Sequence, residues 1–240
     1  MLSLSHASCL LVAALCLLSA CLAVHAADNE SSLSVPAQLR MRGLWIASVS
    51  NIDWPSKVGL TPAESRAELL AYYDLAVANR LNAVMVQVRP TADAFWPSPY
   101  EPWSKWLTGT QGQYPGWDPL AFAVDEAHKR GLEFHAWMNP FRVTLSGGAD
   151  QLVPSHPARV RPDWTVMYNN QLMYNPGVPA ARRWVQDAMM NAVERYDIDG
   201  LHWDDYFYPQ VSTNNSKDLL AGVQKMALLR PGCCLILTCI

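Results

Sequence analysis

The chain has 240 residues, of which 50% are hydrophobic and 16% are charged. This length is enough to bury the core of one domain, so a single domain is the default expectation. The formal net charge is −3, with only 18 Lys and Arg residues. Because no basic surface can be assembled from so few cations, the composition argues against nucleic acid as a partner.

The first 27 residues are predicted to be a signal peptide. An uncharged apolar run, CLLVAALCLLSACLAV, is short for a membrane span and precedes a small-residue cleavage site that ends at Ala26. The stretch LSAC, ending at Cys21, fits the bacterial lipobox, in which the cysteine becomes the lipidated N-terminus. We therefore expect export to the periplasm or outer membrane, with either membrane attachment through a lipidated Cys21 or simple cleavage near Ala26.

The two ends of the chain differ in composition from the part between them. Residues 28–38 are polar and are predicted to be a linker, and residues 39–210 are predicted to form the domain. This domain contains no cysteine, so an exported form needs no disulfide framework. Three cysteines crowd into the last eight residues. For the atypical tail, residues 211–240, an altered or truncated reading of a longer sequence is favoured over a vicinal disulfide or a metal site.

Strand-like and helix-like segments alternate along the domain. The first helix is predicted to follow a capping box in which Thr61 is the N-cap, Pro62 the first helical residue and Glu64 the partner, and Gly131 is expected to end the second helix. Strands are predicted at 43–49, 82–89 and 132–139 and within 197–206, helices after Thr61 and at 118–129 and 179–196, and a hairpin at 166–174.

Loop lengths distinguish among the α/β folds. The connections after strands are long, whereas the returns from helix to strand, NRLN, KRGLE and RYDID, are short. This asymmetry is typical of a barrel whose active site lies at the carboxyl ends of its strands. A glycine-rich phosphate turn, the mark of many doubly wound sheets, does not follow the first strand. We therefore predict an α/β fold of the (β/α)8 TIM-barrel type, with about the first four βα units in this chain.

Inside–outside alternation predicts which side chains meet in the barrel. Successive side chains of a strand face opposite sides, and the apolar sets belong against the helices. The remaining side chains would point into the barrel near its mouth: Gln87, Arg89, His135, Asn139, His202 and Asp204. Buried polar groups cost free energy unless they are paired, so this convergence favours a functional site. The alternative is a set of internally bonded residues in which Arg89 neutralises Asp204.

Among the carboxylates of DIDGLHWDDY, Asp204 is the predicted reactive group. Asp205 falls on the other face or just past the strand, and Asp197 and Asp199 precede it as cap or turn residues. A zinc site is disfavoured because the chain has no HExxH run, and a serine hydrolase because it has no GxSxG elbow. We predict no metal and no cofactor.

Aromatic residues concentrate in the loop after the second strand and again after the fourth. The first group contains Trp96, Tyr100, Trp103, Trp106, Tyr114 and Trp117, close to Asp93, and the second begins at Tyr206. Pyranose rings stack their C–H faces on aromatic rings, so these loops suit a glycan-binding cleft. Packing of the loop onto the barrel rim is the alternative for about half of the rings.

Several long motifs resemble, in order and spacing, the bacterial glycosyl-hydrolase-like 10 family. They are RGLWIASVSNIDWPS, VMVQVRPTADAFWPSPYEPWSKWLTGTQG, PGWDPLAFAVDEAHKRGLEFHAWMNPFR and DGLHWDDYFYP, and together they cover about 40–208. The resemblance ends after Pro209. It implies a (β/α) barrel glycosidase acting on a cell-wall glycan, such as peptidoglycan strands stripped of stem peptides. It also implies a lipoprotein, with cell-division or envelope proteins as partners. HWD, ending at Asp204, is similar to the Lys-Trp-Asp strand end of barrel α-galactosidases, in which the Asp is the nucleophile.

The sequence thus predicts a glycoside hydrolase with Asp204 and Asp205 as catalytic candidates. Glycosidases need two carboxyl groups, and Asp93 and Glu101 are the fallback acids. A non-catalytic glycan-binding barrel and an inactive truncated fragment are the alternatives. The predicted substrate-binding residues are Gln87, Arg89, Asp93, Trp96, Trp103, His135, Trp137, Asn139, Arg142, His202 and Tyr206.

Overall fold

The computed structural model describes residues 40–204 of the chain. The predicted signal peptide with Cys21, the linker at 28–38, Asp205, Tyr206 and the tail at 211–240 lie outside the described residues. Within residues 40–204, no helix is both long and apolar enough to cross a membrane.

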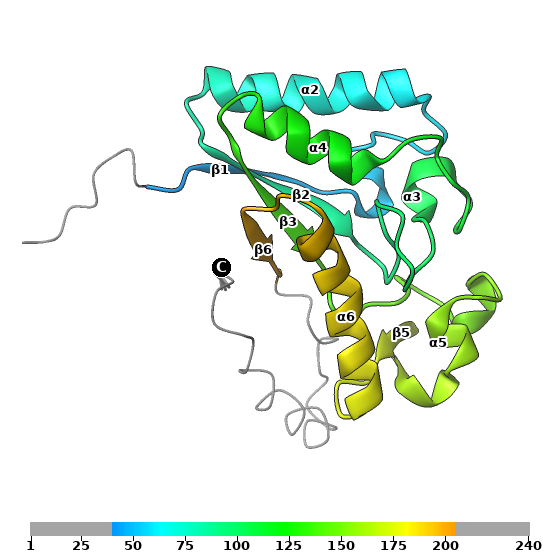
Figure 1. The fold of residues 1–240 in the computed structure, drawn as a ribbon. Helices are drawn as coiled ribbons and strands as arrows, with labels where there is room; N and C mark the ends of the chain where they lie inside the picture. Colours follow the sequence, from blue (N-terminus) through cyan, green and yellow to red (C-terminus); the bar gives the residue numbers. More distant parts are fainter. Residues whose placement is uncertain (1–39, 205–240) are drawn as a thin grey trace, which may run out of the picture. The chain divides into compact units, whose positions relative to one another are not determined.

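Four parallel strands form the main sheet (Figure 1): β1 (Gly43–Ile46), β2 (Ala83–Arg89), β3 (Glu133–Met138) and β6 (Gly200–His202). They stand in the order β1-β2-β3-β6, and each strand pairs in parallel with the next. Neighbours in this sheet are also successive strands of the α/β alternation. The predicted α/β fold with a parallel sheet is therefore confirmed.

Three long helices follow the first three strands of this sheet: α2 (Pro62–Ala78), α4 (Pro119–His128) and α6 (Pro179–Arg195). The predicted capping box of α2 is present, because the Thr61 hydroxyl accepts from the Glu64 N–H and the Glu64 carboxylate accepts from the Thr61 N–H. Figure 1 shows α2 and α4 side by side. The Tyr196 hydroxyl, just after α6, donates to Asp118, the N-cap of α4, at 2.6 Å.

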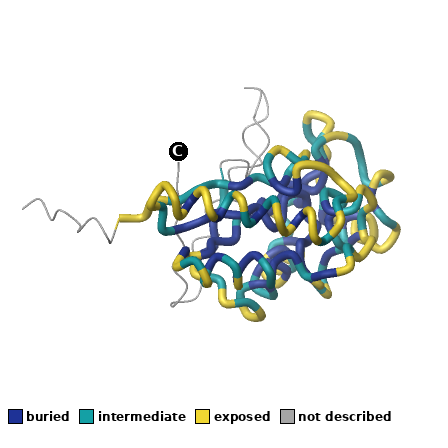
Figure 2. The backbone as a smooth tube through the Cα atoms, turned by 90° about the horizontal axis from the view of Figure 1, so that it is seen from above, coloured by how far each residue is buried: buried dark blue, intermediate teal, exposed yellow. Residues whose placement is uncertain are grey.

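The two faces of the sheet differ in chemistry, as alternation predicts. On one face the register aligns Val84 with Phe134, and Val86 with Ala136. These side chains are fully buried and belong to the hydrophobic core, and Figure 2 shows buried residues in the interior with exposed residues around them. The opposite face aligns Gln87 with Trp137 and carries the polar and aromatic side chains.

Two strand ends differ from their predicted positions. β1 ends at Ile46 rather than at Val49, because the chain turns into a 3-10 helix, η2 (Val49–Asn51), in which Ser50 has a φ of 56°. Gln87 Oε1 accepts hydrogen bonds from the backbone N–H groups of Ser48 and Val49, each at 2.9 Å, and these bonds stabilise the turn. The fourth strand is likewise shorter than the stretch that suggested it.

The connections after β2 and β3 contain short elements. They are α3 (Lys105–Thr108), η3 (Ala149–Gln151), α5 (Pro157–Val160), η4 (Pro162–Trp164), β4 (Thr165–Tyr168) and β5 (Gln171–Tyr174). β4 and β5 form the predicted antiparallel hairpin. Its two-residue turn, Asn169 and Asn170, has positive φ at both positions, which asparagine tolerates better than most residues.

Candidate active site

Hydrogen bonds join the carboxyl ends of the four parallel strands. Gln87, at the end of β2, accepts from the turn after β1 and donates through Nε2 to Asn139 Oδ1 at 2.6 Å. Asn139, just after β3, donates through Nδ2 to Asp204 Oδ1 at 2.6 Å. Gln87 and Asn139 are fully buried, whereas Asp204 is half-buried after β6. Three of the predicted site residues therefore meet at the predicted end of the sheet.

This series gives Asp204 a defined orientation. Asn139 is fixed on its acceptor side by Gln87, so its amide N–H groups are directed toward the carboxylate of Asp204. The O and N atoms of an amide are assigned from the hydrogen-bond network, and here both amides are consistent with one direction of donation. A half-buried carboxylate held by a buried donor is suited to act on a bound substrate.

A cluster of rings lies beside this network. Trp137 and His202 are level with Gln87 in the register, and Trp45 and His135 lie two residues nearer the amino ends of the strands. The Trp45 ring packs edge-on against Trp137, with centroids 5.0 Å apart, and against His202 at 5.4 Å. His135 Nδ1 lies 2.6 Å from His202 Nε2. Burial, with a smaller effect of His135, lowers the pKa of His202 to about 4. His202 is therefore neutral near pH 7.

The expectation that His135 lies near the mouth is wrong. The register pairs His135 with Met85 and Gly200, near the start of the sheet, four residues before Asn139. Its Nε2 atom lies 3.1 Å from Glu133, the first residue of β3. His135 is therefore part of the buried interior. Among residues 40–204, its ring nitrogens contact His202 and Glu133 rather than the Asp204 carboxylate.

Arg89 is not paired with Asp204, which corrects the sequence-based alternative in which it neutralises that carboxylate. Its Nε donates to Glu101 Oε2 at 2.6 Å and its Nη2 donates to Glu101 Oε1, so the two groups form a bidentate ion pair without exposed surface. Nη1 donates to the backbone carbonyls of Asn139 and Pro140. A buried, paired Glu101 is unsuited to be a catalytic acid.

Asp93, the other fallback acid, is also fully buried. Its Oδ1 accepts from the N–H and the hydroxyl of Thr91. Burial raises the pKa of Asp93 to about 6, and Glu101 adds to this rise, while hydrogen bonds from Ser104 and Thr91 oppose it. Arg142 is buried as well and donates to the Pro90 carbonyl at 3.0 Å. The structure therefore gives Asp93 and Arg142 places inside the protein rather than on an accessible cleft.

Most rings of the loop after β2 are used in packing. The prediction that Trp96 faces a sugar is wrong in this structure, because the ring is fully buried and its Nε1 donates to Asn191 on α6 at 3.1 Å. Trp117 is also buried in the core. Trp103 is half-buried and packs against Tyr114, whose side chain is 60% exposed. Tyr114, with Trp103 packed against it, is the most exposed ring of this set.

Sequence reasoning missed His156, which organises the loop after β3. It caps α5, since its Nδ1 accepts from the Ala158 N–H at 3.1 Å. Nε2 therefore carries the proton and donates to the Ala92 carbonyl at 2.9 Å. Burial lowers the pKa of His156, which keeps this neutral form. The His-Pro pair at the start of a short helical run was the available signal.

Asp53 is a second residue that sequence reasoning missed. It lies in the loop after β1 and is half-buried. Its Oδ2 accepts from the Ala47 N–H at 2.8 Å, next to the Ser48 N–H that Gln87 accepts. This carboxylate therefore lies at the same end of the sheet as Asp204, after the first strand rather than after the fourth.

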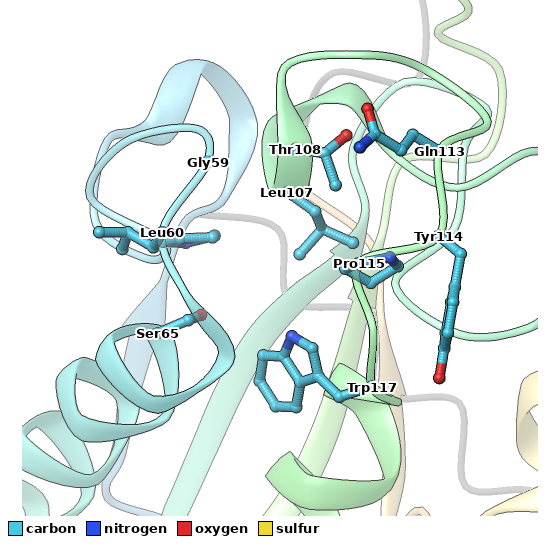
Figure 3. Close-up of a pocket in the computed structure, with 10 residues that line it drawn as sticks. Gly59, Leu60, Ser65, Leu107, Thr108, Gln113, Tyr114, Pro115 and Trp117 are labelled. Carbon is cyan, nitrogen blue, oxygen red and sulfur yellow. The ribbon is translucent and has the colours of Figure 1, made fainter.

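A small pocket of about 210 Å³ lies between the start of α2 and the loop that follows α3 (Figure 3). Leu60 and Ser65 line it on one side, and Leu107 and Trp117 on the other. Of the predicted substrate-binding residues that fall within 40–204, none lines this pocket. Its volume is below the usual range of about 300–1,000 Å³ for small-molecule sites. Within residues 40–204, no three His, Cys, Asp or Glu side chains are grouped so that they could hold a metal ion.

Comparisons with known proteins identify relatives of this chain. It is 54% identical over 170 residues to the glycosyl hydrolase YngK of Bacillus subtilis, an alignment that covers 70% of this chain and 33% of YngK. It is 39% identical over 186 residues to the glycosyl hydrolase DigH of Escherichia coli K12, covering 71% of this chain and 42% of DigH. The chain thus spans between a third and about two fifths of the length of these relatives.

A comparison with solved structures finds the α-galactosidase of Lactobacillus brevis, at 14% identity and a TM-score of 0.45, covering 69% of this chain and 20% of that one. The sequence profile of the family described as Glycosyl hydrolase-like 10 matches residues 40–225, which is more than half of the chain. The chain belongs to the glycosyl hydrolase-like 10 family.

Proposed function

We propose that this chain carries part of the active site of a glycoside hydrolase, with Asp204 as its reactive carboxylate. The observation that supports this proposal is the hydrogen-bonded series from Gln87 through Asn139 to Asp204 at the carboxyl ends of the strands. Active sites of (β/α) barrels lie at this end, and we propose that the four-stranded sheet is part of such a barrel. Family membership supports the reaction class.

In the proposed reaction, Asp204 acts on the anomeric carbon, as a nucleophile or by stabilising the positive charge of the transition state. The glycosidic C–O bond breaks, the leaving oxygen takes a proton from a second carboxylic acid, and water supplies the hydroxyl of the new reducing end. The Asn139 N–H donates to one oxygen of Asp204 and thereby holds the carboxylate in one rotamer. Trp103 and Tyr114 supply ring faces for the sugars. The substrate class is a cell-wall glycan such as peptidoglycan strands without stem peptides, and this part of the proposal rests on the resemblance of the sequence motifs.

The test compares Asp204→Asn with the unchanged chain on denuded glycan strands, scoring new reducing ends by chromatography. We expect turnover to fall by at least about 100-fold, because the reactive oxygen is removed. Asp197→Asn is the matched control, since Asp197 lies seven residues earlier with a side chain that is 95% exposed. Measurable turnover that is equal in Asp204→Asn and the unchanged chain would exclude Asp204 from the chemistry.

A non-catalytic glycan-binding protein is the second candidate, and one observation favours it. Asp93 and Glu101, the two fallback acids, are both buried, so neither presents a second carboxyl group to a substrate. Sedimentation of the chain with insoluble glycan would measure binding separately from cleavage. Binding without new reducing ends, in the unchanged chain, would support this candidate over the hydrolase.

We also propose export as a lipoprotein, with Cys21 as the lipidated residue and envelope or cell-division proteins as partners. The apolar N-terminal run and the LSAC stretch support the first part. A cell-wall substrate requires the protein to lie outside the cytoplasmic membrane, so export and the proposed substrate are consistent with each other.

A further inference from the structure

Glu101 reaches the centre of the protein from the loop after β2. Its carboxylate is held at both oxygens by the Arg89 guanidinium, and neither side chain has exposed surface. Paired hydrogen bonds to a planar guanidinium fix both distance and orientation, which a single ion pair does not do. Glu101 therefore determines where the guanidinium of Arg89 lies.

Arg89 in turn fixes the backbone at the end of β3. Its Nη1 donates to the carbonyl of Asn139 and, at 3.1 Å, to that of Pro140. The Arg89 carbonyl accepts from the Asn139 N–H at 2.9 Å. Both backbone polar groups of Asn139 are therefore bonded to Arg89, and the side-chain direction of Asn139 depends on this attachment.

A local irregularity in β2 makes this arrangement possible. The pairing with β3 runs regularly to Gln87 and then shifts, so that Arg89 rather than Val88 pairs with Met138. An extra residue of this kind re-aims the following side chain, a feature that recurs next to active sites. Here Gln87 and Arg89 contact the same residue. Gln87 donates to the side chain of Asn139, and Arg89 donates to the backbone carbonyl of Asn139.

We propose that Glu101 is a positioning residue that acts through Arg89 and Asn139 on Asp204. The contacts form an unbroken series. The Arg89 guanidinium donates to the Glu101 carboxylate and to the Asn139 backbone carbonyl, and the Asn139 side-chain amide donates to the Asp204 carboxylate. This inference rests on the proposed function for its kinetic consequence only. Its structural consequence, the orientation of the Asn139 amide, can be measured without any substrate.

The first experiment follows the side-chain amide signals of Asn139 by NMR in the 15N-labelled chain. Asp204→Ala removes the acceptor of this amide and defines the signal of the perturbed bond. We expect Glu101→Gln to shift the Asn139 signals in the same sense. Glu126→Gln is the matched control, because Glu126, on α4, is likewise paired with an arginine, Arg130, which follows the same helix. We expect that control to leave the Asn139 signals unchanged.

The second experiment measures kcat and KM separately on denuded glycan strands. A misplaced Asp204 slows the chemical step, so we expect Glu101→Gln to lower kcat by about 10- to 100-fold. A role limited to holding the aromatic loop would instead raise KM, because that loop carries the rings proposed to bind sugar. Glu101→Asp keeps the charge and is expected to recover part of kcat.

A second variant covers the case in which Glu101→Gln does not fold because it leaves a buried charge unpaired. Replacing both partners, Arg89→Met with Glu101→Met, removes the charges together, which buried pairs often tolerate. Either folded variant with unchanged Asn139 signals would overturn the positioning role. Full turnover in Asp204→Asn would overturn the proposed function instead, so the two failures are distinguishable.

Discussion

Asp93 gives the sharpest quantitative prediction, because its carboxyl group is ionised at neutral pH in a place that disfavours charge. The residue has no exposed surface. Burial, reinforced by Glu101, raises the pKa of Asp93 from 3.8 to about 6, against the opposing hydrogen bonds from Ser104 and Thr91. We therefore expect Asp93→Asn to increase the free energy of unfolding at neutral and alkaline pH.

The size of this increase follows from the shift in pKa. A shift of roughly two units corresponds to about 3 kcal/mol at 1.36 kcal/mol per unit. The folded-state pKa lies above the unfolded-state value, so the stability is fully present below about pH 4 and is lost as the pH rises through about 6. The amide that Asp93→Asn introduces keeps an oxygen that can accept from Thr91. The difference in unfolding free energy between Asp93→Asn and the unchanged chain therefore reports the ionisation of Asp93 rather than the loss of this hydrogen bond.

The assay is urea unfolding of the unchanged chain and Asp93→Asn at several pH values from 4 to 8. We expect the difference in unfolding free energy to be near zero at pH 4 and to grow to about 3 kcal/mol by pH 8. Asp163→Asn is the control of opposite sign, because the hydrogen bond from exposed Arg161 lowers the pKa of Asp163. A pH-independent difference, or a less stable Asp93→Asn at pH 8, would refute the reasoning.

Two further predictions concern a buried hydroxyl and the N-terminus. The hydroxyl of Tyr174 is buried and has no hydrogen-bond partner among the described residues, whereas that of Tyr73 donates to the Ala123 carbonyl at 3.1 Å. We expect Tyr174→Phe to leave the unfolding free energy unchanged or higher and Tyr73→Phe to lower it by about 1 kcal/mol, and equal losses in urea unfolding would contradict this contrast. We expect Cys21→Ser to abolish incorporation of labelled palmitate in cells, and undiminished labelling would exclude lipidation at Cys21.

The elements that sequence predicted well are those set by neighbouring residues. Thr61 and Glu64 satisfy each other across three positions, so the start of α2 depends on no distant contact. Alternation along β3 likewise separates Phe134 from Trp137 whatever surrounds the sheet. Because parallel strands end at one edge, the same alternation brings Asn139 and Asp204 together, and this part of the site was predictable.

The contacts that sequence did not predict depend on distant residues or on broken alternation. The shift in pairing at Val88 re-aims Arg89, and the residues of β2 give no local sign of it. Trp96 is fully buried, and its indole N–H donates to Asn191, which lies 95 residues later on α6. From sequence alone, a tryptophan in a long loop can equally well stack on a sugar or pack in the hydrophobic core. For Trp96, the position of α6 determines that the ring packs in the core.

The curvature of the sheet bears on where a second catalytic carboxyl group can lie. The order β1-β2-β3-β6 separates β1 from β6 by three spacings of about 4.8 Å, about 14 Å along the sheet. The rings of Trp45 on β1 and His202 on β6 nevertheless pack with their centroids 5.4 Å apart, so side chains of these two strands meet across the curved sheet. Retaining glycosidases need about 5 Å between carboxyl groups and inverting ones about 6.5–9.5 Å. Asp93 and Glu101, buried in the loop after β2, do not present a carboxyl group to a substrate. Asp53, half-buried in the loop after β1, is therefore the carboxylate to test as the partner of Asp204.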